Sequence, residues 1–282
     1  MRTRPAGLLV ALVATVACLL LVRVPSDANG APGSCGKPEG CTDFELQHAG
    51  STFGWYPETK RYEFKEPDGK IPAVWSHQGK GMFKELNGML GLYADQGGSV
   101  STTWSYAART GRWETRIKLD RMATGPQGTT DYTTTIALVP QKPTDAHCGA
   151  QGITLLKYRP AQPDVAKFAI KTLPANVYGK SLTTPRPVGG AQWHTWAVEV
   201  TPKRISWYVD AAVVAREVRP AALLDVPLKL KVTLTAVPGA TMQSAKAQLD
   251  WARYWTLAKP GKNQDLVAKA PLTGRSTNPT AC

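Results

Sequence analysis

The chain has 282 residues, of which 43% are hydrophobic and 20% are charged. This composition is that of a globular protein and excludes an intrinsically disordered chain, because disordered sequences combine few apolar residues with a high charge. Its 34 Lys and Arg residues against 21 Asp and Glu give a net charge of +13. Such a surplus favours polyanionic partners, such as acidic polysaccharides, membrane surfaces or nucleic acid, although a soluble protein with a merely basic surface fits the same numbers.

The first 28 residues have the three-part pattern of a secretory signal peptide. Two arginines precede an apolar run over 6–22, and Ser26-Asp27-Ala28 supplies the small residues of a cleavage site. The run is slightly shorter than the roughly 20 residues that span a membrane. We therefore expect cleavage after Ala28, no membrane attachment afterwards, and a secreted protein that is extracellular or associated with the cell wall. A retained N-terminal anchor is the alternative. Cleavage leaves 31 basic against 20 acidic residues, a charge of +11.

Four cysteines follow the expected cleavage site. They are Cys35, Cys41, Cys148 and Cys282. An even number of cysteines in an exported chain argues for two disulfides, which can pair in three ways. We favour Cys35–Cys41 together with Cys148–Cys282, because the second bond would fix the polar C-terminal tail to the rest of the protein.

Short strand patterns with Gly and Pro between them recur along most of the chain. We expect strands at 82–86, 89–93, 99–106, 112–119, 132–139, 152–158, 165–173, 193–200, 205–210, 213–218, 228–237 and 246–257. Helical periodicity is nearly absent, apart from a short turn around 221–225. About a dozen short strands predict an all-β sandwich. We place it at 44–257, after an N-terminal segment over 29–43 and before a polar tail over 258–282 that lies on the surface.

The alternation of apolar and polar residues is clearest in the strand expected at 228–237. Leu228, Leu230 and Val232 fall on one face, whereas Lys229 and Lys231 fall on the other. Successive side chains of a strand point to opposite faces, so this strand has a core face and a solvent face.

Several segments resemble glycoside hydrolase family sixteen, which includes laminarinases, lichenases and agarases. The stretch WHTWAVEVTPKRISWYVD (193–210) is similar to a late hairpin of that family. The other matches follow in the same order as in the family: NGMLGL (87–92), TGRWETRIKL (110–119), PLKLKVTLTAV (227–237) and LDWARYW (249–255). The resemblance covers about residues 44–257. It implies a concanavalin-A-like jelly-roll sandwich of two curved antiparallel sheets, with a polysaccharide-binding groove on the concave face.

The same resemblance implies that the catalytic motif is missing. In the family a strand carries Glu-x-Asp-x-x-Glu, often followed by tyrosine. With that tyrosine at Tyr158, the nucleophile position falls on Gly152, the assisting aspartate on Thr154 and the acid/base on Lys157. Retaining glycosidases need two carboxyl groups about 5–5.5 Å apart. We therefore expect no catalytic residue in this strand, and a pseudoenzyme.

The resemblance also nominates residues that would contact a glycan. Ala137 stands where the family has a sugar-stacking tryptophan. Trp193 and His194 open a strand at the groove edge, where they either contact a glycan or pack in the core. Trp104 is either a stacking platform or core filler. Neither HExxH nor paired CxxC spacing occurs, so we expect no metal and no cofactor.

Two acids remain in the matched strands. We expect Glu114 to have a structural role and Glu199 to face solvent, with neither acting in catalysis.

Three functions remain open. The first is a monomeric secreted protein that binds a polysaccharide without catalysis. Its groove would carry Thr154 and Lys157, with Lys229 and Lys231 as further candidates, and would suit an anionic glycan. The second is an active glycoside hydrolase or transglycosylase, acting on a β-glucan-type polysaccharide, whose carboxylates have moved elsewhere. The third is a structural protein of the cell wall. We expect no nucleic-acid binding, because no recognition module is visible.

Overall fold

The computed structural model describes residues 48–67, 69–70, 73–94, 98–121, 132–190, 192–236, 245–262, 272 and 274–277. These residues all belong to one compact unit, Thr42–Cys282. The expected signal peptide, its cleavage site, Cys35, Cys41 and Cys282 lie outside the described residues. In the ranges given above, no helix is both long enough and apolar enough to cross a membrane.

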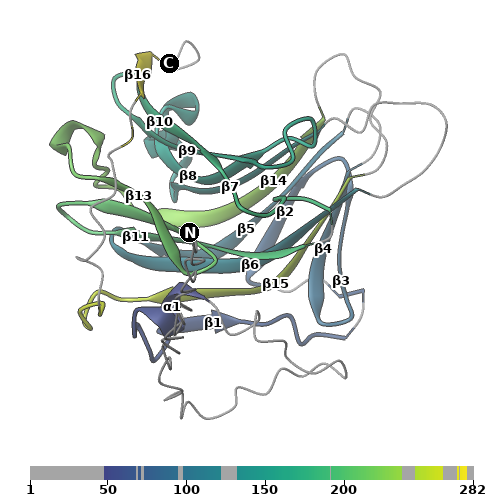
Figure 1. The fold of residues 1–282 in the computed structure, drawn as a ribbon. Coiled ribbons are helices and arrows are strands. Elements are labelled where there is room, and N and C mark those ends of the chain that lie inside the picture. The colour runs from purple at the N-terminus through teal and green to yellow at the C-terminus, as the bar shows by residue number, and fades with distance from the viewer. Residues whose placement is uncertain are drawn as a thin grey trace, which may run out of the picture. The chain divides into compact units, whose positions relative to one another are not determined.

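The described residues form two antiparallel sheets of eight strands each. Sheet A has the order β13 (Ala212–Glu217), β12 (Ile205–Val209), β11 (Trp193–Val200), β6 (Gly111–Arg121), β15 (Ala245–Trp255), β4 (Met89–Ala94) and β3 (Met82–Leu86), and β1 (Lys60–Tyr62) also pairs with β15. Sheet B has the order β16 (Gly274–Thr277), β10 (Asn176–Thr183), β9 (Val165–Thr172), β8 (Gly152–Tyr158), β7 (Tyr132–Pro140), β14 (Leu228–Ala236), β5 (Ser99–Ala108) and β2 (Trp75–Gly79). Strands β10, β9, β8, β7 and β14 of sheet B lie above strands β11, β6 and β15 of sheet A in Figure 1. The prediction of an all-β sandwich is confirmed.

The main core fills the space between the two sheets. Leu228, Leu230 and Val232 of β14 are fully buried in it, whereas Lys229 and Lys231 on the opposite face are only half-buried. Burying a leucine or valine stabilises a fold by about 1.5–3 kcal/mol. Strand β14 therefore has the core face and the solvent face that its alternation predicted.

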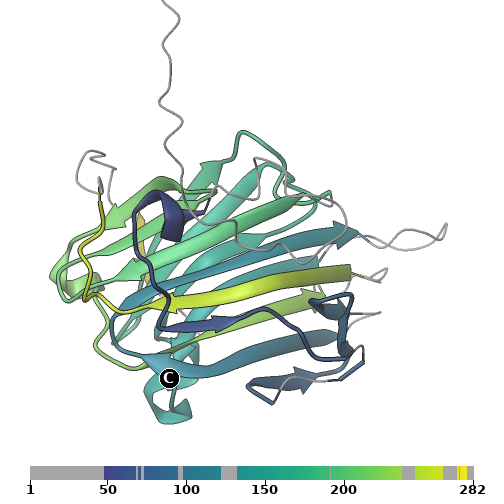
Figure 2. The ribbon, with the colours of Figure 1, turned by 90° about the horizontal axis from the view of Figure 1, so that it is seen from below.

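A second, smaller core covers the outer face of sheet A. The short helix α1 (Ala49–Thr52) and the residues after it bring Phe53 and Trp55 onto Tyr208 of β12 and Trp255 of β15. Figure 2, seen from below, shows α1 and β1 lying over this side of the sheet. Because both faces are covered, all five residues of β12 are buried.

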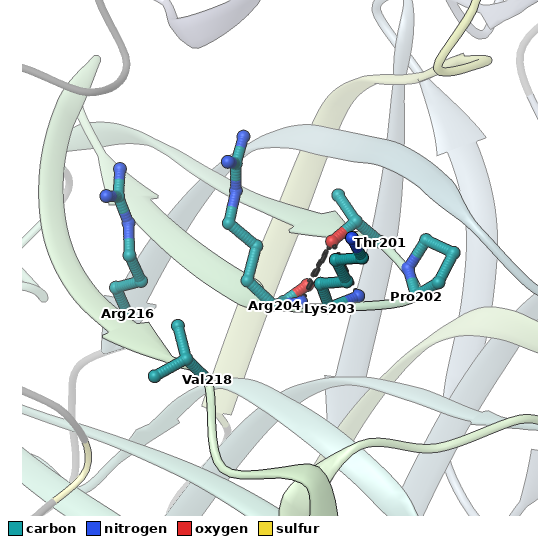
Figure 3. A pocket seen from close by; sticks show the side chains of 6 residues that line it. All are labelled: Thr201, Pro202, Lys203, Arg204, Arg216 and Val218. Carbon is teal, nitrogen blue, oxygen red and sulfur yellow. Dashed lines mark hydrogen bonds between the residues drawn. The ribbon is translucent and has the colours of Figure 1, made fainter.

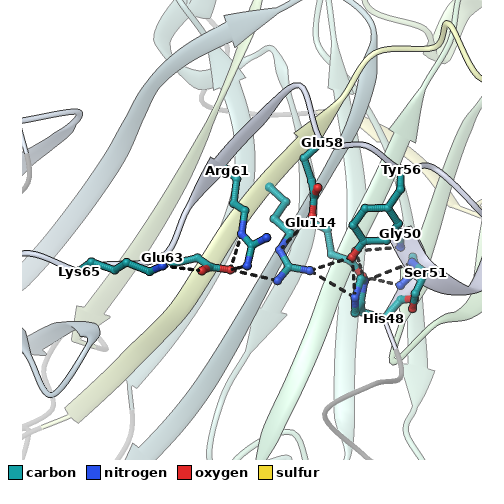
Figure 4. A network of polar contacts seen from close by, with 11 residues as sticks. His48, Gly50, Ser51, Tyr56, Glu58, Arg61, Glu63, Lys65 and Glu114 are labelled. Carbon is teal, nitrogen blue, oxygen red and sulfur yellow. Dashed lines mark hydrogen bonds and ion pairs between the residues drawn. The ribbon is translucent and has the colours of Figure 1, made fainter. Parts of the chain in front are cut away.

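A buried carboxylate holds α1 against sheet A. Glu114 of β6 accepts hydrogen bonds from the backbone N–H groups of Ala49 (2.6 Å) and Gly50 (3.0 Å) (Figure 4). Its third partner is Nδ1 of His48, at 3.3 Å. On the other side of the ring, the guanidinium of Arg253 lies 3.2 Å from Nε2 of His48. Glu114 therefore has a structural role.

Glu199 does not face solvent, and that expectation is wrong. Its side chain is 1% exposed and accepts from Nε of Arg112 (2.8 Å) and Nη2 of Arg204 (2.9 Å). Arg112 also donates to the backbone carbonyls of Thr256 and Lys259. The chain after β15 thus covers this part of the outer face, which a strand pattern cannot indicate.

Several elements were not predicted from the sequence. They are α1, β1, β2, β10, β16, the short helix α2 (Pro143–Ala146) and the 3-10 turn η2 (His147–Gly149). The turn expected at 221–225 is a 3-10 turn, η3 (Pro220–Ala222). The C-terminal tail is not only a surface segment, since Leu272 is fully buried and β16 pairs with β10.

Cys148 lies in η2 and is disulfide-bonded. Its partner is outside the described residues, so the pairing with Cys282 stays a prediction.

An ion pair at the end of β13 fixes the C-terminal tail. The guanidinium of Arg219 donates to both carboxylate oxygens of Glu217, at 2.8 and 2.6 Å, and to the backbone carbonyl of Leu272. Burial disfavours the charged form of Glu217. The hydrogen bonds from the side chain and backbone of Arg219 and from the Val218 N–H outweigh that effect and lower its pKa.

We predict that Glu217→Gln destabilises the protein in a pH-dependent way. A lowered pKa contributes stability above the unfolded value of about 4.3, and that stability is lost as the pH falls through the folded value. At pH 7 the variant should lose about 1–3 kcal/mol, the range for hydrogen bonds to a charged group. Urea unfolding at pH 7 and pH 3 measures the difference. A loss that is equal at both pH values would contradict the assignment.

Candidate functional site

Strand β8 contains an extra residue that changes which side chains face outward. Ile153, Leu155 and Leu156 are all buried, so two consecutive residues of this strand point into the core. The register with β7 shifts at the same place, because Ala137 lies opposite Thr154 whereas Ile136 lies opposite Leu156. This is a β-bulge, in which two residues of one strand oppose one residue of the next. The bulge brings Lys157 onto the same face as Thr154, although the two are three residues apart.

Small side chains occupy the middle of this outer face. Thr154 lies between Ala137 of β7 and Ala169 of β9. Gly152 has a φ of +152°, and a Cβ there would come within 3.0 Å of the Leu138 carbonyl oxygen. Any larger residue at position 152 is therefore strained. Together these residues form a strip without large side chains, which we call the small-residue strip.

Lysines lie on both sides of the small-residue strip. Lys157 is directly opposite Lys167 of β9, and Lys171 lies four residues further along β9 on the same face. On the other side, Lys231 of β14 is opposite Ala137, and Lys229 is opposite Val139. Lys157 and Lys167 are exposed and the other three are half-buried.

The two sheets differ sharply in charge. The eight described strands of sheet B contain no Asp and no Glu, whereas the strands of sheet A contain both. Across the described ranges, none of the five lysines has an ion-pair or hydrogen-bond partner for its side chain. Partial burial and the neighbouring charge of Lys157 lower the pKa of Lys171. The described part of the outer face of sheet B therefore carries five lysines that no described residue pairs with.

The structure separates three of the predicted contact residues from this face. Trp104 is 3% exposed and stacks on Trp75 in the core, with ring centroids 6.0 Å apart. His194 is 2% exposed on the core side of β11, where its Nδ1 is 2.8 Å from Asp210. Trp193 lies on the outer face of sheet A, over the guanidinium of Arg116. Trp104 and His194 are therefore buried in the sandwich, and Trp193 lies on a different sheet from Lys157.

Two residues of the basic face were missed by sequence reasoning. Lys167 and Lys171 belong to VAKFAIKT, where both lysines alternate with buried Phe168 and Ile170. This alternation is the sequence pattern from which the position of both lysines on the solvent face could have been predicted. As for metals, no group of three or more His, Cys, Asp or Glu in the described part of the chain could hold an ion.

A separate basic depression lies at the edge of sheet A. It has a volume of about 480 Å³ and is lined by Thr201, Pro202, Lys203, Arg204, Arg216 and Val218. Figure 3 shows the guanidinium groups of Arg204 and Arg216 extending in the same direction. Because Arg204 is already paired with Glu199, the charge of this depression is partly compensated.

The fold is that of laminarinases of glycoside hydrolase family sixteen. The laminarinase catalytic domain of Thermotoga maritima MSB8 is 14% identical, with a TM-score of 0.59, over 71% of this chain and 98% of that chain. The laminarinase of Flavobacterium sp. UMI-01 is 13% identical, with a TM-score of 0.58, over 71% and 100%. A mutant of SCLam, a non-specific endo-β-1,3(4)-glucanase from family GH16, holds 1,3-β-D-cellobiosyl-glucose at its active site; it is 16% identical, with a TM-score of 0.58, over 71% and 95%.

At the level of sequence, no family model matches the chain and no curated protein matches it. What the similarity to the solved structures establishes is the fold, a jelly roll of two sheets.

The bulge in β8 makes a prediction about stability. In a regular strand one of two neighbouring residues faces solvent, but here both Leu155 and Leu156 are buried. We expect Leu155→Ala and Leu156→Ala each to cost about 2–5 kcal/mol, as for other buried leucines. Thr154→Ala, on the outer face, should cost less than about 1 kcal/mol. Denaturant unfolding of the three variants tests this. A near-neutral effect of either leucine change would show that the bulge is absent.

Proposed function

We propose that this protein binds a polysaccharide on the outer face of sheet B and does not hydrolyse it. The observation that carries the proposal is the absence of Asp and Glu from the eight described strands of that sheet, in a chain with a laminarinase fold. The fold supports a glycan as the ligand, because the SCLam mutant with this fold holds a β-glucan oligosaccharide. The charge of the face supports an acidic glycan.

The chemistry of the outer face supports binding without cleavage. A retaining glycosidase needs one carboxylate as nucleophile and a second carboxyl group as acid/base. By the family resemblance these positions are Gly152 and Lys157, and neither side chain supplies a carboxylate. The strained backbone at Gly152 also disfavours any side chain there. Hydrolysis by the family's mechanism would therefore lack both of its reactive groups.

An active enzyme with relocated carboxylates is the alternative that the fold similarity favours. Two described acids lie near β8: Asp145 in α2, which precedes the strand, and Asp164, which follows it. A strand of seven residues, roughly 20 Å long, lies between them in the chain. Nothing in the described structure brings these two acids together as a retaining or inverting pair, whose carboxyl groups lie at most about 9.5 Å apart.

We also propose that the protein acts outside the cell. The pattern of the first 28 residues supports export. The disulfide at Cys148 is consistent with this, because disulfides persist in oxidising compartments.

We predict no measurable turnover of laminarin, lichenan, agarose or carrageenan. Reducing ends released by the purified protein should not exceed those of a boiled control, because the described strands of sheet B contain no carboxylate. The proposal fails if reducing ends are released and if substitution of one Asp or Glu abolishes that release.

The location of the binding site is tested by filling the small-residue strip. Thr154→Trp should lower polysaccharide affinity by about tenfold, because the indole would occupy the space between Ala137 and Ala169. Ala212→Trp, at an exposed position of β13 in sheet A, is the matched control and should change affinity by less than about twofold. Affinity electrophoresis or calorimetry measures both. Equal effects of the two variants would place the binding site elsewhere.

A further inference from the structure

We infer that the ligand is a linear acidic polysaccharide, held at two points by lysines on either side of the small-residue strip. The inference rests on the proposed function and names the substrate class of that same face.

The first point of contact consists of three lysines on β8 and β9. Lys157 and Lys167 are directly opposite each other, and such cross-strand partners have Cβ atoms about 4.5–5.5 Å apart. Lys171 lies on the same face, close enough for the charge of Lys157 to affect it. Like charges directly opposite each other destabilise a sheet. An anionic group bound between them would relieve that repulsion.

The second point of contact is the pair Lys229 and Lys231 on β14. Two spacings of about 4.8 Å separate β8, with Lys157, from β14, and three separate β9, with Lys167 and Lys171, from it, so the two groups lie about 10–14 Å apart. Between them lie Thr154 and Ala137, whose short side chains leave the surface low. A ligand that reaches both groups must therefore be an extended chain with charges along its length.

The face lacks the groups that would recognise a neutral glycan or a nucleic acid. Neutral sugars and unpaired bases are usually held by stacking on aromatic rings. The aromatic residues of the central strands, such as Tyr132, Tyr158 and Phe168, are all buried on the core side. On the described central strands β7, β8, β9 and β14, the outward residues are lysines, threonines, alanines, valines and one glycine. Recognition here depends mainly on charge, and lysine ammonium groups suit carboxylates, sulfates and phosphates.

Two lysine pairs and a control pair test the two-point arrangement. The site variants are Lys157→Gln with Lys167→Gln, and Lys229→Gln with Lys231→Gln. Lys203→Gln with Lys262→Gln removes the same charge from exposed positions outside sheet B. Calorimetry uses oligogalacturonates of increasing length, sulfated carrageenan oligosaccharides and neutral laminarin oligosaccharides. Thermal unfolding of each variant confirms that it is folded.

We expect affinity for the acidic oligosaccharides to rise with length until the chain spans both lysine groups, because a second contact made by the same chain gains from effective concentration. Each site variant should remove this gain and lower the affinity of the long oligosaccharides by about tenfold, whereas the control pair should change it by less than about twofold. Comparison of the oligogalacturonates with the sulfated carrageenan oligosaccharides shows whether carboxylate or sulfate is the preferred anionic group.

Four results would overturn the inference. Equal losses in the control and site variants would show only a generally basic surface. Tighter binding of a DNA duplex, with the same dependence on the lysine pairs, would assign the face to nucleic acid. Equal binding of neutral laminarin oligosaccharides, blocked by Thr154→Trp but insensitive to the lysines, would keep the proposed function and refute the two-point inference. Binding of no polysaccharide at all would refute both.

Discussion

The extra residue in β8 determines what the outer face of sheet B presents to solvent. Without the bulge, the strict alternation of a strand would turn Lys157 toward the core and one of Leu155 and Leu156 toward water. With the bulge, both leucines point into the core, and Gly152, Thr154 and Lys157 lie on the outer face. The hydrophobic core and the candidate site therefore depend on the same backbone irregularity. A change that removes the bulge would damage both together.

The outer faces of the two sheets differ in their charged residues. On sheet A, Glu114 and Glu199 are buried under α1 and under the chain after β15, and each is fully occupied by hydrogen bonds that hold those segments in place. On sheet B the described strands carry basic residues and no acids. Glu114 and Glu199 thus stabilise the fold, whereas no described residue pairs with the lysines of β8, β9 and β14.

Much of the fold could be predicted because its strands alternate clearly or match a known order of segments. Strands β3, β8 and β11 have the predicted bounds, and β14 has the predicted faces. Strands β10 and β16 were missed because NVYGKSLT and GRST contain glycine and polar residues and lack a regular apolar alternation. Their positions depend on pairing with β9 and with each other, which is a tertiary effect.

The site could be predicted only in part. Gly152, Thr154 and Lys157 were nominated by family resemblance, and the structure places them on one face. Glu199 was misplaced because a strand pattern cannot show that another segment covers its polar face. Trp104 looked equally suited to stacking or to the core, and only its contact with Trp75 of another strand decides between them. Lys167 and Lys171 gain significance only when β9 is paired with β8, which local sequence does not reveal.

The most direct measurement is a crystal structure of the protein with a bound acidic oligosaccharide that is long enough to span β9 to β14. The account predicts continuous ligand density over the small-residue strip, with anionic groups within hydrogen-bond distance of a lysine on β8 or β9 and of a lysine on β14. Density confined to the basic depression beside Arg204 and Arg216, or to the outer face of sheet A, would contradict it.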